Sequence, residues 1–166
     1  MKAFRPALFA AAGLSFSAAI VGLASSVIAQ HGSHHTVVSG DEIKWGPAPP
    51  SLPPGAQAAV LLGSPAKEGP FVLRLKLPAG FLVPPHRHSK DEFVTVIAGK
   101  FGVSSGESVD RASLKALPPA SFVHLPAGMP HYAWAEVETI VQINGVGPFD
   151  VNYINPQDDP RKKPVN

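Results

Sequence analysis

The sequence predicts an all-β domain that follows a leader over residues 1–29. Seven short segments have the length and β-propensity of strands. They are residues 57–62, 71–77, 92–98, 101–104, 121–125, 139–144 and 149–154. Turns rich in Pro and Gly separate them, and after the leader no stretch of about twelve residues sustains a helical period. Many short strands of this kind close into a sandwich or small barrel in which alternate side chains point inward.

Length and composition support a single folded domain. The chain has 166 residues, of which 45% are hydrophobic and 16% are charged, so it is too apolar and too weakly charged to be disordered throughout. It contains no Cys. Disulfide scaffolds, thiol nucleophiles and Cys-ligated metal sites are therefore excluded, and any metal ion must be held by His, Asp or Glu.

The first 29 residues have the pattern of a signal peptide. Lys2 and Arg5 form a positive start, residues 7–28 are uncharged and largely apolar, and Val27-Ile28-Ala29 supplies a cleavage site. We expect cleavage after Ala29 and a periplasmic or secreted protein. The alternative is an uncleaved anchor, because the stretch is long enough to span a bilayer. Its many small Gly, Ser and Ala residues favour cleavage.

Charge gives no reason to expect a nucleic-acid partner. Removal of Lys2 and Arg5 with the leader leaves 12 basic side chains against 12 acidic ones. A neutral mature chain is not steered toward nucleic acid or anionic lipid, so we expect neither nucleic-acid binding nor stable membrane anchoring after cleavage. Small barrels with a free edge and an N-terminal strap often pair as two-fold dimers, which predicts a homodimer.

The mature chain divides into three regions. Residues 30–55 form a strap rich in His and Pro, whose cluster of His31, His34 and His35 could bind metal weakly but fits a flexible exported terminus better. Its prolines predict an extended segment that lies over the domain or leads into it. Residues 56–155 form the β domain, and residues 156–166 form a charged tail.

Four side chains of the β domain could share one metal ion. His86 and His88 are two residues apart, so on an extended segment their imidazoles project from the same face. After a turn, Glu92 opens a strand that we expect beside the first, where its carboxylate can reach the same point. His131 follows a tight loop and supplies a third imidazole. Around a six-coordinate ion this set leaves two positions for water, dioxygen or a chelating substrate.

The spacing of these residues matches a known signature. Gly80, His86, His88, Glu92 and Gly99 fit the pattern G-x5-H-x-H-x3-E-x6-G, which resembles the first signature of the cupin superfamily. A match without gaps at five fixed positions is specific. The resemblance covers residues 56–155 and implies a cupin jelly roll, a small β-barrel, that holds one divalent transition metal ion.

Residues 126–131 resemble the second cupin signature, P-x-G-x2-H, which ends at His131. Two departures occur around it: Ala120 stands where the pattern has Gly, and Ala135 stands where it has Asn. Both are turn or packing positions, so the ligands are unaffected. The implied metal is Fe, Mn, Ni, Co or Zn, and the implied ligands are His86, His88, Glu92 and His131.

The resemblance implies a metal site but leaves the reaction open. Cupins with this ligand set include dioxygenases, decarboxylases, oxalate oxidases and sugar isomerases. No second carboxylate or lysine stands at an obvious interior position, so we expect an oxidoreductase of the dioxygenase or oxidase type that acts on a small oxygenated molecule. Glu92 would be its catalytic proton acceptor.

Two alternatives remain to enzymatic turnover. The first is a module that binds metal or a small ligand as a sensor or store, and the second is a structural barrel with incidental zinc. Residues 45–47, 126–128 and 146–149 are similar to those of small exported cupins of the anti-sigma-factor-like type, which favours the binding alternative.

Four further residues are candidates for lining the substrate site. Tyr132 and Trp134 follow His131, where aromatic packing competes with substrate stacking. Gln142 and Asn144 alternate with apolar residues, which suggests an inward face with a hydrogen-bonding role. We interpret His124 as a structural histidine.

Overall fold

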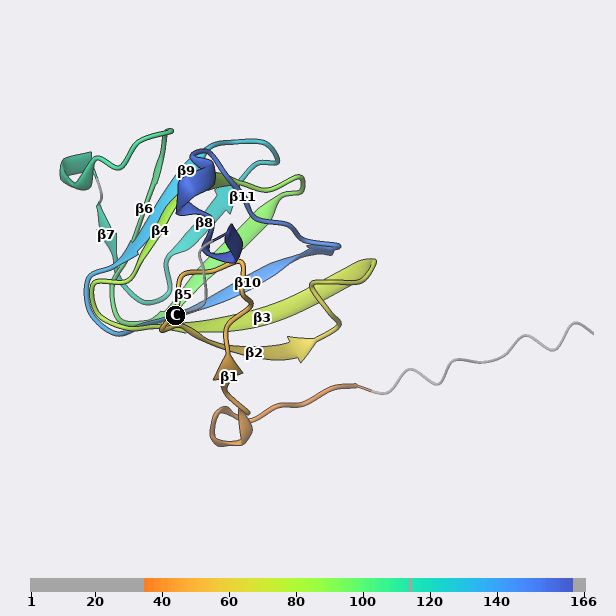
Figure 1. Cartoon of the computed structure of the whole chain (residues 1–166). Helices are drawn as coiled ribbons and strands as arrows, with labels where there is room; N and C mark the ends of the chain where they lie inside the picture. Colours follow the sequence, from red (N-terminus) through yellow and green to blue (C-terminus); the bar gives the residue numbers. More distant parts are fainter. Residues whose placement is uncertain (1–34, 114, 163–166) are drawn as a thin grey trace, which may run out of the picture. The chain divides into compact units, whose positions relative to one another are not determined.

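Strand β3 (Gly69–Leu77) shows how the alternating sequence produces the fold. Its apolar residues Phe71, Leu73, Leu75 and Leu77 are all buried, whereas the residues between them are partly exposed. A strand with one apolar face gains stability only when that face packs against another layer. Here the second layer is a separate sheet (Figure 1).

The computed structural model describes residues 35–113 and 115–162, which form two mainly antiparallel sheets. In sheet order, the first sheet contains β1 (Gly46–Pro47), β2 (Gln57–Leu62), β3, β10 (Thr139–Gly147), β5 (Glu92–Ala98) and β8 (Phe122–Leu125). The second contains β11 (Asn152–Tyr153), β4 (Leu82–Arg87), β9 (His131–Ala135), β6 (Phe101–Ser105) and β7 (Ala116–Leu117). Four 3-10 helices complete the described chain: Gly40–Glu42, Arg111–Ser113, Pro156–Asp158 and Pro160–Lys162.

The predicted all-β class is confirmed, and most expected strands are present with small shifts at their ends. Two strands that carry site residues, β4 and β9, were not among the expected segments, because each contains or follows prolines that weaken a strand pattern. The predicted leader lies outside the described residues. Within the described part of the chain, no helix is long and apolar enough to cross a membrane.

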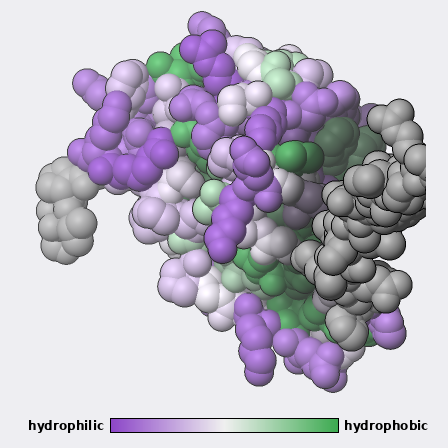
Figure 2. Space-filling view, turned by 90° about the vertical axis from the view of Figure 1, so that its right-hand side faces the viewer, coloured by the Kyte–Doolittle hydropathy of each residue, from purple (hydrophilic) through white to green (hydrophobic). Residues whose placement is uncertain are grey.

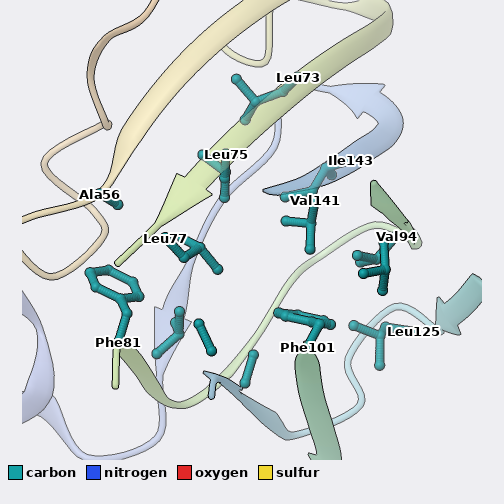
Figure 3. Packing of buried hydrophobic residues seen from close by; sticks show 14 of the residues in the cluster. Ala56, Leu73, Leu75, Leu77, Phe81, Val94, Phe101, Leu125, Val141 and Ile143 are labelled. Carbon is teal, nitrogen blue, oxygen red and sulfur yellow. The ribbon is translucent and has the colours of Figure 1, made fainter. Parts of the chain in front are cut away.

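The space between the sheets is lined by one continuous apolar cluster. Figure 3 shows Leu75 of β3, Val141 of β10 and Val94 of β5 directed into the interior, which Phe101 of β6 enters from the second sheet. Complete burial of a side chain of this kind contributes about 1.5–3 kcal/mol. The cluster therefore holds the two sheets together.

The opposite face of the first sheet is open and of mixed character. Arg74 lies directly across from Gln142 in the β3–β10 register, and its Nε donates a hydrogen bond of 3.1 Å to the Gln142 side chain. Phe93 and Phe122 stack on this outer side with ring centroids 6.4 Å apart. Figure 2 likewise shows apolar surface interspersed with polar side chains on one side of the molecule.

Three tight turns share the same geometry. In residues 78–81, 118–121 and 126–129, the fourth amide donates to the first carbonyl, and the third residue has a positive φ. The third residue is Gly80 (φ 77°) in the first turn, Ala120 (φ 69°) in the second and Gly128 (φ 77°) in the third. This is the pattern of a type II turn, which favours Gly at that position. Ala120, one of the two departures from the cupin pattern, therefore occupies a glycine position.

Candidate metal centre

His86 and His131 are brought together by strand pairing. His86 lies near the end of β4, His131 begins β9, and the two residues are direct partners in the antiparallel register. Their ring centroids are 4.2 Å apart. His88 follows β4 on the same side as His86, as the two-residue spacing predicts, with ring centroids 4.9 Å apart.

Glu92 approaches these imidazoles from the other sheet. It is the first residue of β5, which pairs with β10 and β8 and not with β4. The expectation that this strand would lie beside the His86–His88 segment was therefore wrong. The turn between them crosses from one sheet to the other, and the carboxylate meets the imidazoles across the interior.

In all three histidines, Nδ1 faces a backbone carbonyl oxygen. The Nδ1 atom of His86 lies 2.7 Å from the Pro84 carbonyl oxygen, and that of His131 lies 3.0 Å from the Met129 carbonyl oxygen. His88 Nδ1 is hydrogen bonded to the Asp150 carbonyl. A carbonyl oxygen only accepts, so each Nδ1 carries the proton. Nε2 is therefore the atom that each ring can offer to a metal ion, as in metal-bound histidines.

The free nitrogens and the carboxylate converge. His86, His88 and His131 are buried, and one ring nitrogen from each lies within 4.8 Å of the others. Glu92 Oε2 is 3.2 Å from His88 Nε2 and 3.5 Å from His131 Nε2. Both of these Nε2 atoms are buried without a partner in hydrogen-bonding geometry. Buried polar atoms without partners are costly, and one cation between them would satisfy both. The donor set thus fits a metal ion, and the three histidines could bind one.

The pKa values describe a strongly coupled cluster. Burial, reinforced by His131 and His88, lowers the pKa of His86 to about 3, so its ring is neutral at physiological pH. Burial alone would raise the pKa of Glu92, but the adjacent His131 and His88 outweigh it and lower this pKa to about 2. Burial would likewise lower the pKa of His88, yet Glu92 raises it. The buried carboxylate is therefore anionic and needs a positive neighbour.

Two loops hold the ligands in place. The Gly128 amide donates to the His88 carbonyl at 2.8 Å, which ties the two signature segments together. Asp91 Oδ1 accepts from the Ala127 amide at 2.8 Å, and its other oxygen lies 3.1 Å from His124 Nε2. His124 is thus a structural histidine on the outer side, as expected.

Residues 149–151 support the site in a way that the sequence did not reveal. The Asp150 carboxylate accepts from the amide and hydroxyl of Ser89, at 2.8 Å and 2.9 Å, while its carbonyl orients His88. Phe149 stacks on the His88 ring, with centroids 4.3 Å apart and planes inclined by 23°. No sequence pattern indicates that these residues contact the metal ligands, because their role depends on the chain returning from β10 to β4.

The ligands line part of a cavity of about 550 Å³ between the sheets. Its remaining walls are mostly apolar side chains of both sheets, and residues 47–52 of the proline-rich strap complete the lining. The strap is fixed by hydrogen bonds from the Ala48 amide to Ala56 and from Tyr153 Oη to the Ser51 carbonyl. Residues 47–52 therefore lie against the cavity of the β domain.

The four residues expected to line the substrate site are not among the residues that line this cavity. Tyr132 and Trp134 alternate with His131 along β9 and face away from it; the Tyr132 hydroxyl is hydrogen bonded to the backbone of Asp110. Gln142 and Asn144 alternate with buried Val141 and Ile143, so they share the outer face with Arg74. On β10 the apolar residues, and not the polar ones, face inward.

Structural comparisons identify the fold. Two sheets with this order and a buried histidine cluster form a cupin (RmlC-like) fold. An RmlC-like cupin from Shewanella frigidimarina matches with a TM-score of 0.53 and 14% identity, over 70% of this chain and 94% of that one. At this identity the likeness concerns the fold alone.

The chain belongs to the family described as "Domain of unknown function (DUF4437)", whose model matches residues 36–166. No curated protein matches the chain. The narrower likeness to anti-sigma-factor-like cupins stays a prediction.

Two solved structures of named proteins share the fold. The polyketide cyclase RemF from Streptomyces resistomycificus has a TM-score of 0.58 and 15% identity, over 76% of this chain and 90% of that one. An acetylacetone dioxygenase from Acinetobacter johnsonii has a TM-score of 0.57 and 20% identity, over 76% and 80%.

Proposed function

We propose that the protein holds one divalent transition metal ion on His86, His88, Glu92 and His131 and acts as an oxidoreductase of the dioxygenase or oxidase type. Its substrate would be a small oxygenated molecule. The observation that carries this proposal is the shared hydrogen-bonding pattern of the three buried imidazoles: each Nδ1 is bonded to a backbone carbonyl, and one nitrogen of each ring converges with the others.

When bound, such an ion would supply Lewis acidity and, if redox-active, electron exchange. The protein supplies the surroundings. Three imidazoles and one carboxylate make up the ligand set. Glu92 Oε2 is positioned to hold a proton released by a substrate if the carboxylate loosens from the ion. Apolar cavity walls surround the proposed ligands.

Oxygen uptake tests the catalytic part of the proposal. Protein loaded separately with Fe(II), Mn(II), Ni(II) or Co(II) is supplied with catechols, flavonols, oxalate, thiols and acetylacetone. We expect uptake with at least one metal and compound, and none from metal-free protein or from His131→Ala. His124→Ala, which alters a histidine outside the cluster, is the matched control. If every compound is left unchanged by every loaded form, the oxidase and dioxygenase assignment is withdrawn.

The alternative is a cupin that binds metal or a small ligand without turnover. One observation favours it: apart from the proposed ligands, the residues that line the cavity offer no titratable side chain for acid or base catalysis. Calorimetry on the same compounds separates the two functions. Saturable binding without oxygen uptake supports the binding module, whereas uptake supports the enzyme.

Export and pairing are further proposals that rest on the sequence. An exported protein is expected to begin at Gln30, which N-terminal sequencing of the mature form tests. A homodimer is expected to sediment at twice the mass of the chain.

A further inference from the structure

We infer that the cavity selects a neutral, largely hydrocarbon molecule that carries a chelating pair of oxygens at one end. This inference rests on the proposed function for the chelating end and on the cavity walls for the rest. It names the substrate class and excludes carboxylated, phosphorylated and sugar-like molecules of similar size.

The first step concerns the size and enclosure of the cavity. A volume of about 550 Å³ lies within the range of small-molecule sites, about 300–1,000 Å³. The ligands His86, His88 and His131 are each at most 5% exposed. A molecule that reaches them must therefore give up most of its hydration.

The second step concerns the charges available to the bound molecule. Glu92 is the only acidic residue in the lining, and no Lys or Arg contributes to it. Arg74, Lys76 and Arg87 each lie between two lining residues in the sequence, but each projects from the opposite face of its strand, and Arg74 is hydrogen bonded to Gln142. A carboxylate or phosphate remote from the metal ligands would be buried without a partner, which opposes binding.

The third step concerns hydrogen bonding. Apart from the metal-site residues, the lining contains only two polar side chains, Ser51 and Ser64, and both belong to connecting segments. The walls formed by the strands are apolar. The strap contributes Pro47, Pro49 and Pro50, which have no amide hydrogen to donate. The several hydroxyl groups of a sugar would lose hydrogen bonds to water and find few replacements.

The fourth step concerns the end that meets the site. Three imidazoles and a carboxylate leave two positions on a six-coordinate ion, which suits two adjacent oxygens of one molecule. The same molecule can then extend its apolar part along Leu73, Leu75, Val141 and Ile143. Neutral catechols with alkyl or aryl groups and β-diketones with apolar ends combine these properties.

A matched pair of probes tests the inference without turnover. Zn(II)-loaded protein, which is redox-inert, is titrated anaerobically by calorimetry with 4-tert-butylcatechol and with 3,4-dihydroxybenzoate. Both chelate through the same two oxygens, but one carries an apolar group and the other a carboxylate. We expect the apolar probe to bind at least about tenfold more tightly. Equal or tighter binding of 3,4-dihydroxybenzoate would overturn the inference.

Two variants of the same strand locate the effect. Leu75→Ala removes apolar cavity wall and is expected to weaken binding of 4-tert-butylcatechol by about fivefold. Val72→Ala truncates a partly exposed residue outside the cavity lining and is expected to leave the affinity unchanged. If Leu75→Ala does not fold, the comparison of the two probes on the wild-type protein still tests the inference.

Zinc content, measured before each titration, separates this inference from the proposed function. Protein that holds zinc but binds neither probe overturns the substrate class and leaves the metal site in place. Protein that takes up no metal overturns the proposed function, and the chelating part of the inference falls with it.

Discussion

His86 and His131 are direct partners across the antiparallel pair β4–β9, with ring centroids 4.2 Å apart. Each ring is oriented by a carbonyl two residues earlier in the chain, Pro84 for His86 and Met129 for His131. Strand register therefore fixes the distance between the rings, and local backbone fixes their tautomers. The candidate metal centre is a consequence of sheet geometry. Substitutions that disturb the turns and contacts around the sheets should therefore have measurable effects on stability, hydrogen exchange or metal content.

The first prediction concerns two signature glycines with positive φ. Gly99 has φ 83°, and a Cβ there would lie 2.3 Å from the Glu138 carbonyl oxygen and 2.7 Å from Thr139 Cα. Gly80 has φ 77°, but a Cβ there would meet nothing within 4 Å. We expect Gly80→Ala to lower the free energy of unfolding by about 1–2 kcal/mol, the conformational cost alone. Gly99→Ala should lower it by at least about 2 kcal/mol more, because backbone must move. Equal losses in urea denaturation would contradict this explanation.

The second prediction concerns the alanine in a glycine position. Ala120 has φ 69° in the same kind of turn that uses Gly80 and Gly128. We expect Ala120→Gly to raise the free energy of unfolding by up to about 1 kcal/mol, since relief of the left-handed strain exceeds the added flexibility of the unfolded chain. Ala79→Gly, at the preceding position of the first turn, is the control and should lower stability slightly. A loss of stability in Ala120→Gly as large as in the control would show that the turn is not strained.

The third prediction concerns the strap over the cavity. Tyr153 Oη donates to the Ser51 carbonyl at 2.7 Å, and burial raises the pKa of Tyr153 to about 12, so the hydroxyl keeps its proton. Tyr153→Phe removes this donor and should cost about 1 kcal/mol. The Leu52 amide is hydrogen bonded to the Pro49 carbonyl. In the variant, hydrogen exchange at this amide should accelerate relative to the wild type by more than exchange at the central amides of β3 does. Uniform acceleration along the chain would contradict a local role.

The fourth prediction concerns pH. Asp159 accepts from Arg161 Nε at 2.7 Å, and this hydrogen bond lowers the pKa of Asp159; the same guanidinium donates to the Val151 carbonyl at 2.8 Å. Because the folded-state pKa lies below the unfolded value of about 3.9, the stabilisation is complete above that pH and is lost as the pH falls through the folded value.

Asp159→Asn should therefore be less stable than the wild type near neutral pH, and the difference should shrink below about pH 4. Denaturation curves over this pH range provide the measurement. Glu138→Gln, which neutralises an exposed carboxylate, serves as the control. A difference between Asp159→Asn and the wild type that does not change with pH would exclude the ion pair as its cause.

The strand pattern predicted the fold class because period-2 alternation survives in β3 and β5, where every inward position except that of the proposed ligand Glu92 is apolar. The metal-ligating residues were found because their spacing is local: His86 and His88 share a face by parity alone. Glu92 was correctly grouped with the histidines, but its strand was wrongly expected to pair with the His86–His88 segment. Sequence does not reveal which sheet a strand joins after a turn.

The substrate-lining residues could not be predicted for the same reason. On β10, Gln142 and Asn144 suggested an inward polar face, but the register with β3 places Gln142 beside Arg74 on the outside. Asp150 and Phe149 act through contacts with His88 that only the three-dimensional return of the chain creates. Long-range pairing, and not local propensity, decides such positions.

Metal content tests the central claim most directly. Protein purified without a tag, stripped with a chelator and reloaded with Fe(II), Mn(II), Ni(II), Co(II) or Zn(II), is analysed for bound metal after desalting. We predict about one ion per chain, with loss of most of it in His88→Ala and in His131→Ala and full retention in His124→Ala. Wild-type protein that retains none of these ions, or a His88→Ala variant that retains a full equivalent, would contradict the account.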